Sequence, residues 1–348
     1  MLISDRSDRS DLVDILRPFG DVATVMTSDI PNSPAGICGV VVEMDLRNAI
    51  NVQQVRDRIL GKAYQSMPRL FVLNEALHHC AMQAWALGAT DTIVRPFDAR
   101  GLQQRIRSAF PNTPEDDATA KGRALSKGVA AANLVLAKIF ERLPLGIPLT
   151  FDDVMQAEAQ ILKAIKRSSL REWLQMVGRH HNASYRHCLS VTGYAVAFAQ
   201  HMGMRDADQR RLTRAALLHD VGKAFIPVAI LDKPAALTDE ERAVMRTHPQ
   251  RGYDSLAAQG SFPPEMLDVV LHHHEYLDGS GYPHGLAGDA ISDIVRIITI
   301  VDIHSALTEN RPYRAPFTPA KAFATMEAMT DQLDKHLLQA FRPVALGM

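Results

Sequence analysis

The stretch from Val270 to Leu286 reads VLHHHEYLDGSGYPHGL and joins an apolar segment and three consecutive histidines to a glycine-rich turn. Successive residues of a helix point about 100° apart, so at most two of these histidines can face one site. Glu275 and Asp278 follow them, and Gly279–Pro283 is a turn signal. The stretch therefore points to a site whose other members lie elsewhere in the chain.

Length and composition indicate a soluble two-domain protein. The 348 residues exceed one ordinary domain of about 100–200 residues. A hydrophobic content of 47%, with 22% charged residues and a net charge of -1, suits globular cores and gives no field that favours nucleic acid or membrane. Any anionic ligand must then be held by a local cluster. The three cysteines are too few and too far apart for a disulfide framework, which favours a reducing cytoplasm. The N-terminus carries charges where a signal peptide needs an apolar core, and no apolar run reaches the ~18 residues of a membrane span.

The apolar pattern changes along the chain. Five segments before residue 110 read as short strands, with helix-like stretches between several of them: LIS, VATVMT, ICGVVVEM, RLFVLN and DTIVRPF. Such alternation predicts a parallel sheet covered by helices. PNTPEDDATAKG, residues 111–122, reads as a linker, and Arg123–Leu143 has the spacing of an amphipathic helix. After Thr150 nearly everything has helical periodicity. We expect an α/β domain over residues 1–112, a linker and connecting helix over 113–149, and an all-α domain over 150–345.

A second unusual stretch is LLHDVGKAF, residues 217–225, in which His219 and Asp220 follow an apolar helical run. Alone, this dipeptide is uninformative. The rest of the helical half adds further candidate ligands, namely His187, His248, His273, His274 and Asp302. Imidazole and carboxylate together suit Fe, Mn, Zn or Ni. More than four such groups would overfill one tetrahedral ion, so the number of candidates favours at least two ions. A pair of ions can activate water and clamp the oxygens of a phosphodiester.

These residues resemble the HD-GYP subgroup of the HD phosphohydrolase superfamily. The resemblance rests on HD at 219–220, HHE at 273–275, DGSGYP at 278–283 and RPYR at 311–314, and it covers roughly residues 150–340. It implies a helical bundle that holds a dinuclear transition-metal site, with iron first and manganese, zinc or nickel as alternatives. It also implies hydrolysis of the bacterial messenger cyclic di-GMP to pGpG or onward to GMP. The implied metal ligands are His187, His219, Asp220, His248, His273, His274 and Asp302, with Asp220 between the ions and His272 left over.

The resemblance also suggests roles around the ions. Lys223, four residues after His219, would meet a phosphate oxygen or the leaving group if the helix continues. Arg311 and Arg314 would present two guanidinium groups to the substrate phosphates, or they form an ordinary surface pair. Tyr282 would either stack on a guanine or support its loop.

Two departures from the pattern concern the metal site. Some family members hold a third metal with a glutamate four residues before the first histidine, but that position here is Ala183, which favours two ions. His304 and Ser305 stand where many relatives carry an aromatic residue and a second aspartate. This change leaves Asp302 intact but alters the groups around it.

Residues 86–110 resemble the last strand and helix of a response-regulator receiver domain, which has a flavodoxin-like fold. In such a domain Asp5 would lie near the first strand and Asp45 would be the phosphoacceptor. Asn74 stands where serine or threonine is expected and Arg95 where lysine belongs. Arginine lacks the compact ammonium group of lysine. A degenerate receiver used for dimerisation or partner binding is therefore favoured over one that is phosphorylated on Asp45.

Three functions remain open at this point. The favoured one is a cyclic di-GMP phosphodiesterase in bacterial signalling. The others are a sensor or adaptor for cyclic di-GMP or pGpG with little turnover, and a phosphodiesterase for another cyclic dinucleotide. The expected partners are cyclic di-GMP, a second copy of the chain through the receiver-like domain or connecting helix, and signalling proteins, but no membrane or nucleic acid polymer.

Overall fold

The computed structural model describes residues 1–6, 10–34, 36–61, 63–64, 67–74, 80, 83–84, 87–109, 117–178, 182–310 and 315–347. Its first part is a five-stranded parallel sheet in the order β2-β1-β3-β4-β5. The strands are β1 (Leu2–Ser4), β2 (Thr24–Met26), β3 (Val40–Glu43), β4 (Arg69–Leu73) and β5 (Asp91–Val94). All five predicted strands are present, and their order is the flavodoxin-like one. The predicted α/β class of this region is confirmed.

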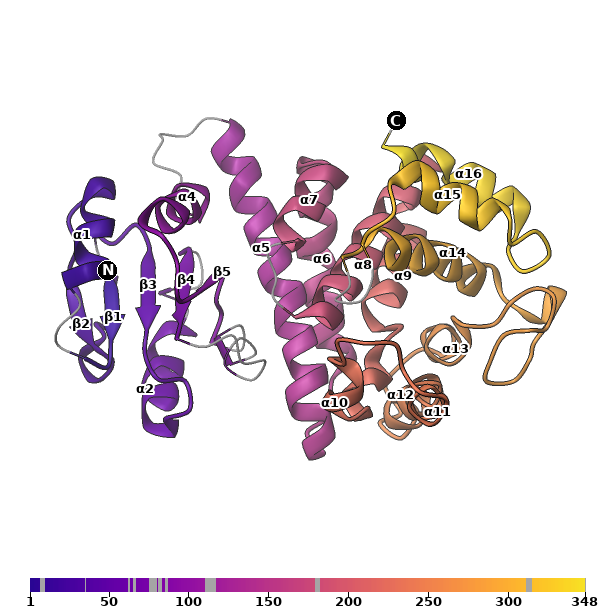
Figure 1. Ribbon diagram of the computed structural model, residues 1–348, viewed down its shortest axis with the longest axis horizontal. Coiled ribbons are helices and arrows are strands. Elements are labelled where there is room, and N and C mark those ends of the chain that lie inside the picture. The colour runs from indigo at the N-terminus through magenta and orange to yellow at the C-terminus, as the bar shows by residue number, and fades with distance from the viewer. Residues whose placement is uncertain are drawn as a thin grey trace.

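Helices cover both faces of this sheet (Figure 1). Alternate strand residues point to opposite faces, so Val40 and Val42 pack with α2 (Ala49–Ile59) while Val41 packs with α1 (Ser10–Leu16) and α4 (Ala99–Ala109). Strands buried on both faces read as continuous apolar runs, which is why VVV marks β3.

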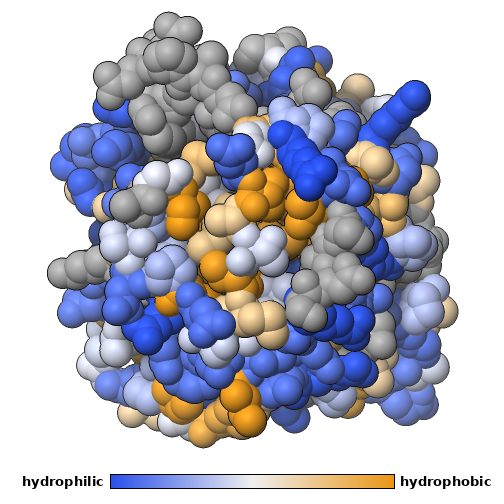
Figure 2. Space-filling view, turned by 90° about the vertical axis from the view of Figure 1, so that its left-hand side faces the viewer, coloured by the Kyte–Doolittle hydropathy of each residue, from blue (hydrophilic) through white to orange (hydrophobic). Residues whose placement is uncertain are grey.

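β2 is an edge strand, and its Met26 is 37% exposed. Figure 2 shows the side of the molecule that carries the first elements of the chain, where apolar side chains gather near the middle and polar ones surround them. Edge strands with apolar neighbours are common contact surfaces. Dimerisation through this domain stays a prediction.

A long helix, α5 (Asp117–Ala137), follows the sheet and continues into a π-helical turn, Lys138–Arg142. The predicted linker is therefore wrong over residues 117–122, because charged and small residues there form the first turns of this helix. Four apolar residues of this helix lie in the core of the helical half: Val129, Ala132, Leu136 and Ile139. Gly128 lets α5 approach α6 (Phe151–Arg167) closely, since an added Cβ would lie 2.4 Å from the Cβ of Ala164.

The remainder is all-α, as predicted. Its further helices are α7 (Leu170–Val177), α8 (Ala183–His201), α9 (Asp206–Leu218), α10 (Val228–Leu231), α11 (Asp239–Met245), α12 (His248–Ala257), α13 (Pro264–His272), α14 (Asp293–Thr308), α15 (Pro319–Glu327) and α16 (Lys335–Leu346). α8 and α14 are buried on most of their sides, so polar residues on them lie inside the bundle. Among the described helices, none is both long and apolar enough to cross a membrane.

Candidate metal centre

The site begins where α9 ends. His219 caps this helix at its C-terminus, and Asp220 precedes a short 3-10 segment, Val221–Phe225. An added Cβ on Gly222 would lie 1.8 Å from the backbone oxygen of His248, so only glycine lets this turn pack on α12. The glycine of the HD stretch thus brings Asp220 beside His248, with 3.2 Å between Oδ1 and Nε2.

Three histidines share one arrangement at helix ends. The Nδ1 atom of His219 lies 2.7 Å from the carbonyl oxygen of Ala216, that of His248 lies 2.8 Å from Met245, and that of His273 lies 3.1 Å from Val269. A carbonyl oxygen can only accept, so each Nδ1 carries the proton and each Nε2 is left to bind a metal. The last turn of a helix leaves some of its carbonyl oxygens without helical partners, and the Val269 oxygen accepts the backbone N–H of His273 as well.

All seven predicted ligands lie together, and all of them except the half-buried His274 are buried. Their donor atoms form two groups whose members lie within 4.8 Å of one another: Asp220, His248, His273 and His274 in one, and His187, His219 and Asp302 in the other. Each group joins residues that are far apart in the sequence, and the adjacent residues His219 and Asp220 contribute one to each group.

Asp220 belongs to the first group and also faces the second. Its Oδ1 is 3.2 Å from His248 Nε2 and 3.7 Å from His273 Nε2. Its Oδ2 is 3.3 Å from His219 Nε2 and 3.5 Å from His187 Nε2. Each oxygen thus faces a different set of imidazoles, so Asp220 could contribute a donor to two ions.

The cluster fits transition-metal ions. Within the described part of the chain, Nε2 of His219 and Oδ1 of Asp220 are buried without a hydrogen-bond partner. A buried polar atom of this kind is explained by a bound ion or water. Five imidazoles and two carboxylates exceed the four ligands of a tetrahedral ion, so the donor set fits two ions.

Burial and neighbouring charges set the protonation of these groups in the metal-free chain. Burial lowers the pKa of His273 to about 4, so its ring is neutral at pH 7. Burial would also lower the pKa of His187, but Glu309 and Asp302 outweigh it and raise that pKa to about 10. For Asp302, burial is outweighed chiefly by His187, 2.8 Å away, so its pKa is lowered. Burial would raise the pKa of Asp220, but Lys223 and His219 outweigh it and lower that pKa too, so both carboxylates are ionised. A metal ion would have to displace the proton from Nε2 of His187.

Lys223 reaches the site by a different route from the predicted one. The helix does not continue past Leu218, but the 3-10 segment turns the ammonium group back to Asp220, with 2.5 Å from Nζ to Oδ2. Burial would lower the pKa of Lys223, and Asp220 outweighs this effect and raises it. The side chain is thus a fixed positive charge beside the cluster.

The glycine-rich turn is braced by Glu275. Its carboxylate accepts the backbone N–H groups of His284 (2.7 Å), Gly285 (3.1 Å) and Leu286 (3.1 Å). An added Cβ on Gly281 would lie 2.4 Å from the Cα of Glu275, so this glycine is required as well. Glu275 therefore holds the loop that follows the histidines in place.

Tyr282 and His272 lie at the edge of the cluster. The Tyr282 ring stacks on His274 at 4.7 Å between centroids, and the exposed Arg246 places its guanidinium 4.4 Å from the ring centroid. This favours the supporting role of Tyr282. His272 contacts Asp268 (2.7 Å) and His284 (3.0 Å) and is the histidine left over, as predicted.

Four more residues bear on the predicted site. Arg311 and Arg314 lie outside the described residues. Ala183 begins α8 and brings no carboxylate to the cluster. Sequence reasoning missed Glu309, whose carboxylate lies 3.2 Å from His187 Nδ1. Its spacing of seven residues from Asp302, two turns along one helix face, was the available signal.

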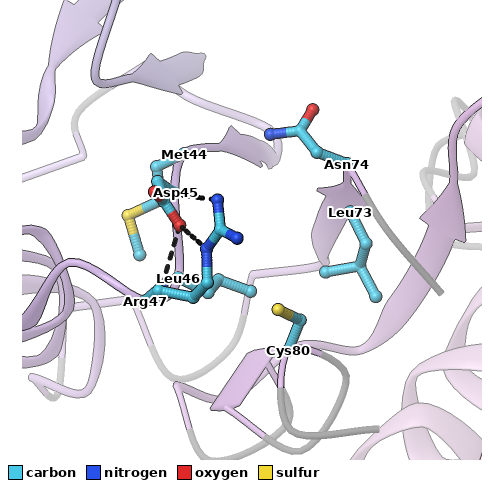
Figure 3. Close-up of a pocket in the computed structure, with 7 residues that line it drawn as sticks. All are labelled: Met44, Asp45, Leu46, Arg47, Leu73, Asn74 and Cys80. Carbon is cyan, nitrogen blue, oxygen red and sulfur yellow. Dashed lines mark hydrogen bonds and ion pairs between the residues drawn. The ribbon is translucent and has the colours of Figure 1, made fainter. Parts of the chain in front are cut away.

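The sheet domain has a separate small pocket beside Asp45, lined also by Met44, Leu46, Arg47, Leu73, Asn74 and Cys80 (Figure 3). The Asp45 carboxylate is held by Arg47, with 3.1 Å from Nε to Oδ1. Asp5 accepts the backbone N–H of Asp45 at 2.7 Å. Arg95 contacts Glu43 (2.7 Å) and Asp11 (2.6 Å) instead. The carboxylate of Asp45, the predicted phosphoacceptor, is therefore already paired with the guanidinium group of Arg47.

Comparisons with known proteins agree with this geometry. The sequence profile of the HD domain family matches residues 155–337. A cyclic di-GMP phosphodiesterase of Pseudomonas aeruginosa is 37% identical over 158 residues, covering 45% of this chain and 38% of that protein. The cyclic di-GMP phosphodiesterase response regulator RpfG of Xanthomonas campestris is 30% identical over 261 residues, covering 75% of this chain and 62% of that protein. The chain thus spans less than two thirds of either relative.

Two further similarities concern substrate and fold. A 3'3'-cGAMP-specific phosphodiesterase of Vibrio cholerae is 43% identical over 141 residues, or 40% of this chain and 30% of that protein. The solved structure of Bd1817, an HDG"Y"P protein from Bdellovibrio bacteriovorus, superposes with a TM-score of 0.52 at 18% identity and covers 70% of this chain and 78% of that one. At this identity the second similarity shows the fold alone.

Proposed function

The chain belongs to the HD domain family, and we propose that it is an HD-GYP-type, metal-dependent phosphodiesterase that hydrolyses cyclic di-GMP to pGpG or GMP in bacterial signalling. One observation carries the proposal: Asp220 belongs to one of two groups of imidazole and carboxylate donors and also faces the other, and each group is able to hold an ion. Several relatives are named cyclic di-GMP phosphodiesterases, which supports the substrate class.

The seven clustered residues would hold two transition-metal ions, with iron first and manganese, zinc or nickel as alternatives. Such ions supply Lewis acidity toward phosphate oxygens and water when bound. Lys223 holds an ammonium group beside Asp220 and would stabilise negative charge that develops on the leaving oxygen. Arg311 and Arg314 would bind the substrate phosphates, and Tyr282 would shape the wall of the site through His274.

Two alternatives concern turnover and base identity. Three relatives are named 3'3'-cGAMP-specific phosphodiesterases, which supports another cyclic dinucleotide as the second candidate substrate. A sensor or adaptor with little turnover is the other alternative. The completeness of the donor set favours hydrolysis over sensing.

We also propose that residues 1–112 form a degenerate receiver-like domain, 113–149 a connecting segment and 150–345 the phosphohydrolase domain, in a cytoplasmic protein. The flavodoxin-like strand order and the similarity to a response regulator over 75% of the chain support the receiver-like identity. Asn74 and the pairing of Asp45 with Arg47 favour degeneracy. Dimerisation and contacts with signalling proteins would be its remaining roles.

The decisive experiment is anaerobic purification with Fe or Mn, followed by chromatography of cyclic di-GMP and its products. The wild-type chain should hold about two ions and form pGpG or GMP. Asp220→Ala should lose metal and hydrolysis together, whereas His272→Gln should keep both, since His272 lies outside the two donor groups. A metal-loaded wild-type chain that binds but never cleaves cyclic dinucleotides would reject the proposed enzyme.

A further inference from the structure

Glu309 caps the C-terminal end of α14. It contacts His187 at Nδ1, on the side of the ring opposite the other donors of the cluster. Its Oε2 and Oε1 atoms lie 3.2 Å and 3.3 Å from Nδ1 of His187. The side chains of His187 and Glu309 are only 6% and 15% exposed, so the contact is largely shielded from water. Charge-assisted hydrogen bonds are strongest in such surroundings.

His187 needs this partner because of its place in the fold. Three other histidines of the cluster, His219, His248 and His273, donate Nδ1–H to carbonyl oxygens in the last turn of a helix. His187 instead lies within α8, where the preceding carbonyl oxygens accept from the helix itself. A side-chain acceptor must take the place of the backbone, and Glu309 lies where that acceptor is needed.

The carboxylate of Glu309 is itself fixed by the preceding turn of α14. Ser305, four residues earlier, donates its hydroxyl to Oε1 of Glu309 at 3.0 Å. Ser305 is also the position where the sequence departs from the second aspartate of the HD-GYP pattern. Glu309 thus supplies a carboxylate four residues beyond that position, and Ser305 holds it in place.

We propose that Glu309 is a positioning residue that accepts the Nδ1 proton of His187 and so directs Nε2 of His187 toward Asp220 and Asp302, with Ser305 fixing the carboxylate. This inference rests on the proposed metal centre. Outer partners of this kind orient a ligating histidine, and their removal weakens metal binding by about 10–100-fold.

The test is titration of the full-length, metal-free chain with Mn²⁺ or Zn²⁺ by calorimetry, with melting temperatures of the metal-free forms measured alongside. Glu309→Ala and the isosteric Glu309→Gln should weaken binding by about 10-fold or more. Adding Ser305→Asp to Glu309→Ala should recover most of the loss. Aspartate reaches one atom beyond serine, toward the place that Glu309 Oε1 leaves, 3.3 Å from His187 Nδ1. Glu327→Gln, an exposed glutamate on α15, is the matched control and should bind as the wild type does.

The outcomes separate positioning from simple stability. Recovery of metal affinity by Ser305→Asp supports the inference, since a carboxylate at either position then serves His187. Unchanged affinity in both Glu309 variants overturns it, and so does a loss that Ser305→Asp leaves uncorrected. A wild-type chain that binds neither metal ion would instead overturn the proposed metal centre, so the two failures are distinguishable.

Discussion

Replacing His304 with phenylalanine should stabilise the folded protein. His304 is 0% exposed, and neither of its ring nitrogens has a hydrogen-bond partner among the residues that the structure describes. The ring lies edge-on to Tyr194 at 4.9 Å and to Phe341 at 5.3 Å between centroids. Burial lowers the pKa of His304 to about 4, so the ring is neutral at pH 7 and occupies an aromatic environment. Phenylalanine suits these surroundings and has no polar atom to leave unsatisfied.

The size of the effect follows from two opposing terms. Each buried donor or acceptor without a partner costs about 1–3 kcal/mol, so the two nitrogens together cost about 2–6 kcal/mol. Phenylalanine has a larger ring than histidine, and overpacking a dense core costs about 1–3 kcal/mol. The expected net gain is about 1–3 kcal/mol. Each kcal/mol raises the melting temperature by about 2–4 °C in a unit of 150–250 residues.

Scanning calorimetry of the full-length chain at pH 7.5, with a chelator so that bound metal does not contribute, measures this gain. His336→Phe is the matched control, because His336 is exposed on α16 and its change should stay within about 0.5 kcal/mol. A melting temperature for His304→Phe at or below that of the wild type would refute the reasoning from unsatisfied nitrogens.

Four further predictions follow from particular contacts. Gly222→Ala should lower the melting temperature and metal content together, since the added methyl group would lie 1.8 Å from a backbone oxygen of α12; Gly122→Ala, with open space around it, should do neither. Lys223→Ala should lower kcat more than it raises KM in assays of cyclic di-GMP hydrolysis, because the ammonium group acts most strongly on charge that develops in the transition state; a change in KM alone would contradict its assigned role. Acetyl phosphate with Mg²⁺ should leave Asp45 unmodified by mass spectrometry, and a phosphorylated species that disappears in Asp45→Asn would show a working receiver. Burial raises the pKa of Glu141 to about 7, so the folded chain keeps a proton that the unfolded chain releases above pH 4.5, and stability should fall as pH rises from 4.5 to 7. Glu141→Gln should remove up to about 3 kcal/mol of this dependence in unfolding titrations, and a stability difference from wild type that is the same at pH 5 and pH 8 would contradict it.

The fold was accessible from the sequence where the apolar pattern was strong. Continuous apolar runs such as VVV in β3 predicted buried parallel strands, and the helical periodicity after Thr150 predicted the all-α half. The pattern failed over residues 117–122, where composition indicated a linker. Those residues are helical because the rest of α5 packs on α6, and a helix that is held by its neighbours extends through residues with little apolar character of their own.

The sequence by itself determined the chemistry of the site, because histidine and aspartate in the HD and HHE stretches are the side chains that transition metals require. Only the tertiary structure decided how they are used. It turned the two oxygens of Asp220 toward different donor groups and brought Lys223 back to the site after its helix had ended. It also set Glu309 behind His187, across 122 residues of chain. The sequence specifies the type of each side chain. The direction in which its donor atom points depends on which helix ends meet in the folded bundle, and helix packing decides that.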